Sequence, residues 1–346
     1  MQIRTLRRDE RERLLELLDL WALPDGWRGR DFFRRYVEDD PTFEDENVMV
    51  AEEAGELVSC VQIFPRPVRI RGRAVPMGGI GSVFTKPEQR RGGLARRLLE
   101  VALERMRERG LLVSLLFGDE RIYHVLGWRA WQAQALLAVR EGTPADRAAH
   151  DAGIRAFDRA RDLAAIREIH ARYSGRFDGT VVRDDRLWET TLLVSGNPDE
   201  EFLVALRGDS GGAPVAYARA VVMRSFLVVS ELGRTDAGAD ALAALVDRML
   251  EPRKEDPLAR PDRPSAELRR LAALPWVPDA ELHAALAARG LAVKPVENPT
   301  VMWRCVDAPA LARHLDLEIL PGEDGESLLR RVLPPGRFTY WTADRF

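Results

Sequence analysis

Residues 82–100 read SVFTKPEQRRGGLARRLLE and set the architecture of the N-terminal half. The segment starts as a strand, passes through a tight turn rich in arginine and glycine, and continues as a helix over 90–108, where apolar residues recur at spacings of three and four. A helix that begins directly after such a turn directs its free N–H groups and the positive end of its dipole at one point. This arrangement is typical of an anion-binding site.

The turn contains the residue types that a bulky phosphate group requires. Gly93 lets the backbone approach a pyrophosphate closely, and Arg90 and Arg91 are placed to add charge-assisted hydrogen bonds. The alternative is that Gly92 and Gly93 only form a turn and that the arginines belong to a solvated face. The turn residues alone leave both interpretations open.

The flanking sequence alternates strand-like and helix-like segments and predicts an α/β (α+β) fold. We expect strands at 2–6, 47–52, 57–64, 68–73, 75–85, 111–117 and 128–139, and helices at 10–20, 30–38 and 90–108. The strand, long helix and short buried strand over 75–117 form a crossover unit whose strands are parallel neighbours. Small and polar residues at 143–153 predict a linker.

The same order of elements returns after the linker. We expect strands at 154–158, 202–207, 215–223, 226–232, 268–274 and 301–306, and helices at 162–173, 184–193, 239–249 and 279–289. The sequence therefore predicts two domains at 1–142 and 154–306, each with a mixed central sheet flanked by helices, and a small appendage at 307–346.

Composition excludes several classes of function. The chain has 52 basic and 55 acidic side chains, so its net charge of -3 provides no attraction to nucleic acid. No run approaches the ~18 apolar residues of a membrane span, and the charged N-terminal residues lack the apolar core of a signal peptide, so we expect a cytoplasmic protein without membrane partners. The five histidines and two cysteines show no metal-ligand spacing, which predicts no metal.

The spacing Arg90-x-x-Gly93-x-Ala95 fits the R/Q-x-x-G-x-G/A signature of GNAT acetyltransferases, and the chain resembles that superfamily. The resemblance implies tandem GNAT folds and acetyl-CoA as co-substrate. It also implies that the backbone of 83–85 pairs with the pantetheine arm and that 91–96 surround the pyrophosphate. The predicted cofactor contacts are Val83, Phe84, Thr85, Arg90, Arg91, Gly92, Gly93, Leu94, Ala95, Arg96, Gly118 and Asp119.

Residues 118–131, GDERIYHVLGWRAW, follow the short strand and contain Tyr123. In GNAT proteins this region carries a tyrosine beside the cofactor sulfur, so the resemblance implies that Tyr123 is the general acid. A phenol with a pKa near 10 is suited to protonate a departing thiolate of similar basicity. The alternative is that Tyr123 is a half-buried packing residue.

The second half of the chain provides an internal comparison. At the corresponding turn it has Arg234-x-x-Ala237-x-Ala239, with alanine where the signature requires glycine. A Cβ atom at that position would crowd the phosphates, so we expect this half to bind no cofactor.

Within the superfamily, the layout resembles the enhanced intracellular survival (Eis) family in its segment 83–96, its IYHVLGW motif, its cofactor-free second half and its terminal aromatic residue. In that family the terminal carboxylate reaches the active site as a base, which implies this role for Phe346. The resemblance also implies a homo-oligomer, either a trimer or a hexamer. The family's sterol-carrier-like last domain is longer than the region after Val306, so a shortened form is expected here. That difference and the cation of Arg345 argue against broad aminoglycoside acetylation.

These inferences predict direct transfer of an acetyl group from acetyl-CoA to a primary amine of a small molecule or peptide, with Tyr123 and Phe346 as catalytic residues. An early aromatic group is expected mostly to pack in the core, with one or two members meeting a cationic acceptor beside Asp31. Its members are Trp21, Trp27, Phe32, Phe33 and Tyr36. The alternative is a catalytically weak acyl-CoA-binding sensor or scaffold. The presence of both Tyr123 and a carboxylate terminus favours the enzyme.

Overall fold

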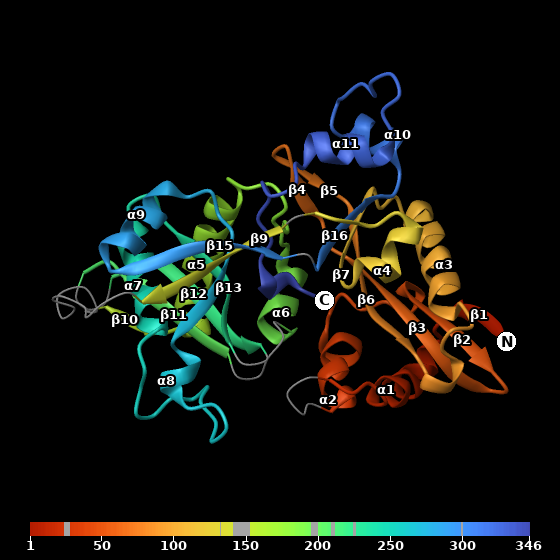
Figure 1. Ribbon diagram of the computed structural model, residues 1–346, viewed down its shortest axis with the longest axis horizontal. Helices are drawn as coiled ribbons and strands as arrows, with labels where there is room; N and C mark the ends of the chain where they lie inside the picture. The colour runs from red at the N-terminus through yellow and green to blue at the C-terminus, as the bar shows by residue number, and fades with distance from the viewer. Residues whose placement is uncertain are drawn as a thin grey trace.

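The computed structural model describes residues 1–23, 28–131, 133–140, 153–194, 200–208, 212–223, 226–298 and 300–346. Within these residues, two seven-stranded mixed sheets lie side by side with their helices, and a two-stranded sheet accompanies the first (Figure 1). The predicted α/β (α+β) class, with mixed sheets flanked by helices, is confirmed.

The first sheet has the order β1-β2-β3-β6-β7-β16-β8. Its strands are β1 (Gln2–Thr5), β2 (Val48–Glu53), β3 (Glu56–Pro65), β6 (Met77–Thr85), β7 (Val113–Phe117), β16 (Val301–Cys305) and β8 (Arg129–Ala130). The helix α3 (Leu94–Glu108) joins the parallel neighbours β6 and β7. The crossover expected from the sequence is therefore present.

Successive side chains of β2 alternate between two hydrophobic cores, one on each face of the first sheet. Val48 and Val50 belong to a core with α1 (Arg11–Asp19) and α2 (Gly29–Arg34), whereas Met49 and Ala51 belong to a core with α3. Successive side chains of a strand point to opposite faces. The first sheet is therefore packed on both faces.

The second sheet has the order β10-β11-β12-β13-β14-β9-β15. Its strands are β10 (Ile154–Ala156), β11 (Glu200–Leu206), β12 (Pro214–Met223), β13 (Phe226–Arg234), β14 (Leu271–Pro275), β9 (Ala133–Arg140) and β15 (Leu291–Asn298). Its helices are α5 (Arg159–Ser174), α6 (Asp185–Val194), α7 (Ala239–Met249), α8 (Ser265–Leu268) and α9 (Ala280–Ala288). The pair β13 and β14 is parallel with α7 between them in sequence, as β6 and β7 are with α3.

Each half of the chain contributes one strand to the sheet of the other half. The predicted domain boundaries at 142 and 306 therefore do not separate the two sheets. β9 lies between β14 and β15 in the second sheet, and β16 lies between β7 and β8 in the first. Apolar alternation specifies that a segment is a strand, but its partners are set by contacts distant in sequence, such as Leu136 opposite Leu274. Of the expected linker at 143–153, only Gly153 is within the described residues.

Two local differences from the expected elements have direct causes. α3 begins at Leu94 rather than at 90, because Arg91 and Gly93 have positive φ values of 69° and 75° and cannot belong to a right-handed helix. β15 was not predicted from the sequence, because it contains Pro295 and mostly exposed or half-exposed side chains. It lies at the edge of its sheet, where proline is tolerated.

The C-terminal region packs on the first half and then runs between the halves. α10 (Ala308–His314) and α11 (Gly325–Val332) share a core with the small sheet of β4 (Val68–Ile70) and β5 (Arg73–Val75). The chain then enters the space between the two sheets, where the label of its C-terminus lies in Figure 1. The last residue, Phe346, thus lies against β6 and β7. The short helix α4 (Glu120–Tyr123) follows β7 in the chain.

Candidate active site

The N-terminus of α3 is built to receive an anion. Gly93 is the N-cap residue, with φ 75° and ψ 12°, and no side chain caps this helix end. A Cβ atom added to Gly93 would have no neighbour within 4 Å among the described residues, so the position faces open space. Leu94 is buried, and its contribution at this turn is therefore its backbone N–H.

The arginines of the turn are exposed and differ in how they are held. Arg90 donates from Nε to the Thr85 carbonyl at 3.1 Å, and its guanidinium lies 5.8 Å from the Phe84 ring centre. Arg96 pairs with Glu100 at 2.9 Å across one turn of α3. Arg90 is thus tied to the end of β6, close to the residues predicted to line the pantetheine arm.

The pairing of β6 with β7 ends before β6 does. The last paired residues are Ile80 and Leu116, whereas β6 continues to Thr85 while still paired with β3 on its other side. Ser82 has φ 50° at a register shift in the β3 pairing, which marks a bulge. The backbone of Val83, Phe84 and Thr85 therefore has no strand partner on the β7 side within the described chain, and this free edge suits an extended ligand.

Phe346 lies where these two strands separate. Its ring stacks on Phe64 of β3, with centroids 5.2 Å apart and an interplanar angle of 21°, and its centroid is 5.9 Å from that of Phe117 of β7. Its main-chain carbonyl carbon and oxygen are 3.4 Å from the position that a Cβ atom would take on Gly81 of β6. The main-chain carbonyl group of Phe346 is therefore beside the bulged part of β6.

Tyr123 lies on the other side of the end of β7. Its ring rests against the backbone of Gly118, where a Cβ atom would be 2.5 Å from Cε2, and packs edge-on against Trp128. Burial raises the pKa of the phenol to about 12. Among the described residues, none forms a side-chain hydrogen bond with the Tyr123 hydroxyl, which is therefore available to a ligand.

The structure gives Gly118 and Asp119 supporting positions. Gly118 forms the floor under the Tyr123 ring, where a side chain would not fit. Asp119 is the N-cap of α4 and accepts from the Arg121 backbone N–H at 3.0 Å. The side-chain hydrogen bond and charge of Arg121 lower the pKa of Asp119 to about 2. Both residues hold the turn that presents Tyr123.

The early aromatic residues connect to the terminus through ring contacts. Tyr36 is 5.7 Å from Phe64, which in turn stacks on Phe346. Trp21 stacks on Phe84 at 5.7 Å. Phe33 and Tyr36 are buried, as expected for core packing, whereas Asp31 is exposed and Trp27 lies outside the described residues.

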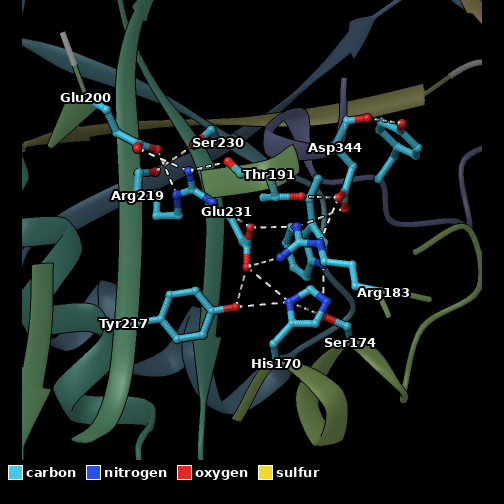
Figure 2. Close-up of polar contacts among 12 residues, drawn as sticks. His170, Ser174, Arg183, Thr191, Glu200, Tyr217, Arg219, Ser230, Glu231 and Asp344 are labelled. Atoms are coloured by element: carbon cyan, nitrogen blue, oxygen red, sulfur yellow. Dashed lines mark hydrogen bonds and ion pairs between the residues drawn. The ribbon is translucent and has the colours of Figure 1, made fainter. Parts of the chain in front are cut away.

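A buried charge cluster next to the C-terminal tail was not predicted. Figure 2 shows Arg183 between the carboxylates of Glu231 and Asp344, with His170, Tyr217 and Arg219 nearby. Arg183 could not be predicted, because a loop sequence does not distinguish an exposed arginine from one in a buried ion pair. The available signal was a glutamate inside the apolar strand FLVVSELGR, since a charge in a buried strand requires a partner.

In the corresponding turn of the second half, Arg234 pairs with carboxylates of the protein itself. Arg234 donates to Asp279 from Nε at 2.8 Å and from Nη2 at 2.9 Å, and both side chains are buried. It also pairs with Glu281 at 2.6 Å. This arginine is therefore occupied by carboxylates of the second half, and the absence of a cofactor there stays a prediction.

Part of the chain matches a known domain family, and its fold matches solved structures. Residues 2–131 match the acetyltransferase (GNAT) domain family. An uncharacterized N-acetyltransferase of Streptomyces griseus is 32% identical over 150 residues, which cover 40% of this chain and 35% of that protein. A GCN5-related N-acetyltransferase from Kribbella flavida matches with a TM-score of 0.62 and 21% identity over 93% of this chain and 74% of that one. Eis1 from Mycobacterium abscessus matches with a TM-score of 0.59 and 20% identity over 91% and 76%.

Residues 2–131 therefore match a GNAT acetyltransferase domain, and the chain shares its fold with a GCN5-related N-acetyltransferase over 93% of its length. Eis1 is among the structures that share this fold, as the resemblance to the Eis family implied. The match spans about a third of the length of the curated relative.

Two further features of the described residues bear on the site. Their helices are each too short or too polar to cross a lipid bilayer. Their histidine, cysteine, aspartate and glutamate side chains form no group of three or more that is placed to hold a metal ion.

Proposed function

We propose that this protein transfers the acetyl group of acetyl-CoA to a primary amine of a small molecule or peptide, by direct attack in a ternary complex. The observation that carries the proposal is the position of the Phe346 carboxylate beside Gly81, where β6 and β7 separate. An acyl group delivered along the free edge of β6 would meet this carboxylate.

The cofactor would be held by backbone groups and arginines. The free N–H groups of the first turn of α3 and the open space at Gly93 suit the pyrophosphate, and Arg90 and Arg91 supply positive charge. The unpaired edge at residues 83–85 suits the amides of the pantetheine arm. Phe84 and Leu94 contribute only their backbone, since both side chains are buried.

The chemical step forms a C–N bond and breaks a C–S bond. The amine lone pair attacks the thioester carbonyl carbon, and the nitrogen then releases a proton to the Phe346 carboxylate. Tyr123 donates its phenolic proton to the departing sulfur, so that the products are the N-acetyl compound and free CoA thiol. Solvent then returns a proton to Tyr123 and takes one from Phe346, which restores the enzyme.

The raised pKa of Tyr123 changes the argument for its role. A phenol with a pKa of about 12 stays protonated at every physiological pH, which a general acid requires. It is a weaker acid than an ordinary phenol, but a thiolate formed in the same buried place is also less solvated and therefore more basic. The pKa values of the phenol and of the CoA thiol therefore stay close to each other, because burial raises both.

The terminal carboxylate acts after attack rather than before it. A free α-carboxylate titrates near 3.5 and an alkylamine near 10, so direct deprotonation of an ammonium ion is strongly unfavourable. Once the nitrogen has attacked, it is far more acidic and can lose its proton to Phe346. Before that step the carboxylate orients the amine.

Assembly and location follow from the same resemblance to the Eis family. We propose a homo-oligomer, a trimer or a hexamer, that acts in the cytoplasm. Light scattering at micromolar concentration tests the assembly, because a particle of 39.0 kDa would be a monomer.

Labelled acetyl-CoA and a panel of polyamines, aminoglycosides and peptide amines test the proposed reaction. Acetylation of at least one amine, with CoA thiol released in equal amount, is the expected result. Saturable acetyl-CoA binding without acetylation of any amine in the panel would favour the acyl-CoA sensor instead.

A further inference from the structure

Residues 339–346 run from the second half of the molecule into the active site. The Thr339 backbone N–H donates to the Asp178 carbonyl at 2.8 Å. The buried Trp341 indole donates to Ser174 Oγ at 2.9 Å and stacks on Tyr173 of α5, with ring centroids 6.4 Å apart. The tail is therefore fixed to the second half up to position 341.

The next anchor is an ion pair between Arg183 and Asp344. Arg183 donates from Nε to Oδ1 at 2.7 Å and from Nη2 to Oδ2 at 2.9 Å, and the two side chains are 0% and 2% exposed. Thr191 adds a hydrogen bond to Oδ1 at 3.3 Å, and the Tyr340 hydroxyl donates to the Asp344 carbonyl at 2.8 Å. A bidentate ion pair of this kind fixes both the position and the orientation of the Asp344 carboxylate.

The other side of the Arg183 guanidinium is also held. It donates to Glu231 from Nη1 at 3.1 Å and from Nη2 at 2.7 Å (Figure 2). Although burial opposes the ionisation of Glu231, the charge of Arg183, followed by His170 and Arg219, keeps the pKa of Glu231 well below its usual value. Burial, and then the charge of Arg183, lowers the pKa of His170. Arg183 is thus fixed by one carboxylate while it holds another.

Arg183 is also tied to the first half of the molecule. The segment before it pairs with the chain at β4: Arg69 N–H donates to the Thr180 carbonyl at 2.8 Å, and Val182 N–H donates to the Pro67 carbonyl at 2.7 Å. Pro67 follows β3, which carries the Phe64 ring that stacks on Phe346. The anchor and the active-site ring are therefore positioned by the same part of the first half.

From these contacts we infer that Arg183 and Asp344 are positioning residues that set the place of the Phe346 carboxylate beside Gly81. This inference rests on the proposed catalytic role of Phe346. Only Arg345 separates Asp344 from Phe346, and its guanidinium lies 4.8 Å from the Phe117 ring centre. Two residues span at most about 7 Å, so a shift at Asp344 passes almost directly to the terminal carboxylate.

The experiment measures turnover for Asp344→Asn in two backgrounds, the free-acid protein and a protein whose terminus is amidated by semisynthesis. In the free acid we expect kcat to fall by on the order of 10²-fold, because a displacement of about 1 Å has effects of that size. The dissociation constant for acetyl-CoA should stay the same, since α3 and β6 are untouched. In the amidated protein the same substitution should change kcat less than about twofold, because the group that it displaces has lost its charge.

Asp256→Asn provides a matched control. Asp256 forms a similar buried pair with Arg269 in the second half, with Nη2 to Oδ1 at 2.7 Å and side-chain exposures of 1% and 0%. Its side-chain hydrogen-bond partners among the described residues are Leu258, Ser265 and Arg269, all outside the tail. It should lose stability as Asp344→Asn does but retain kcat. If Asp344→Asn does not fold and therefore fails to bind acetyl-CoA, Arg183→Lys replaces it as the test variant. This substitution keeps the positive charge but removes the bidentate hydrogen bonding to Asp344.

The outcomes separate the two ideas. Equal kcat for the amidated and free-acid parents would refute the catalytic role of Phe346, and this inference with it, before any change at Asp344 is considered. If amidation lowers kcat but Asp344→Asn does not, or lowers it equally in both backgrounds, the role of Phe346 stands and the positioning role is overturned. Loss of kcat confined to the free-acid background supports it.

Discussion

The ring of Phe346 covers Gly79 so closely that a Cβ atom on residue 79 would lie 2.3 Å from Cζ of that ring. The glycine is needed for the approach of the terminal ring to β6. A Cβ atom on Gly81, two residues on, would lie 2.9 Å from Cε2 of Phe64 and 3.4 Å from the main-chain carbonyl group of Phe346. Phe346 thus packs on the backbone of β6, the strand that is proposed to bind the cofactor.

Gly79→Ala should displace the Phe346 ring and lower kcat by on the order of tenfold to 10²-fold, with little change in acetyl-CoA affinity. The matched control is Gly78→Ala, whose Cβ atom would point to the opposite face and meet the side chains of Met106 at 2.7 Å and Leu111 at 3.0 Å. Steady-state kinetics and calorimetry compare the two variants. A Gly79→Ala enzyme as active as Gly78→Ala would show that the ring contact has no part in catalysis.

Gly93→Val should abolish acetyl-CoA binding, because its side chain would point into the open space proposed for the pyrophosphate. The positive φ adds strain of about 1–2 kcal/mol for a non-glycine residue. Gly110→Val controls for that strain, since Gly110 lies after the other end of α3 with φ 68° and also faces open space. Calorimetric titration should find binding in Gly110→Val alone; micromolar affinity in both variants would contradict the site.

Tyr123→Phe should lower kcat by about 10²-fold or more while acetyl-CoA affinity stays the same, because the hydroxyl acts only on the leaving sulfur. Since burial raises the pKa of Tyr123 to about 12, the phenol remains protonated through pH 10. The pH profile of kcat should therefore show no loss from this group between pH 8 and 10. A decline near pH 10 that disappears in Tyr123→Phe would show that the phenol titrates normally.

The buried pair of Arg234 and Asp279 should make stability depend on pH. Burial opposes ionisation of Asp279, but hydrogen bonds from Arg234 and Tyr173 lower its pKa from 3.8 to about 2. The ionised carboxylate is therefore favoured in the folded state, and a contribution of about 2 kcal/mol, present above pH 4, is lost as the pH falls toward 2.

Urea unfolding at pH 7 and at pH 3 measures this contribution. Asp279→Asn should lose about 3–5 kcal/mol at pH 7, because Arg234 is left buried without its partner. Its stability should also fall less than that of the parent between the two pH values. An unchanged pH dependence in the variant would show that Asp279 does not carry the effect.

The cofactor side of the site could be predicted because its determinants are close in sequence. The run from Val83 to Ala95 specifies a strand, a glycine turn and a helix start by local rules, and the structure has all three. The start of α3 was predicted four residues early, because the positive φ at Arg91 has no signature in a non-glycine residue.

The other side of the site depends on contacts between distant segments. Arg183 and Asp344 are 161 residues apart, and the exchanged strands β9 and β16 pair across the two halves. Periodicity indicates whether a strand is buried, not which sheet it joins. Phe346 was identified only through a family resemblance, and the packing that would hold it in place is visible only in the folded chain.

The turnover number of a protein amidated at Phe346 tests the central claim most directly. Amidation removes the terminal charge but keeps the ring in contact with Gly79 and Phe64. We predict that kcat falls by about 10²-fold or more, as expected for loss of a proton-accepting group, while acetyl-CoA binds with unchanged affinity. Equal turnover numbers for the amidated and free-acid proteins would contradict the account, because the carboxylate would then be neither a base nor an orienting group.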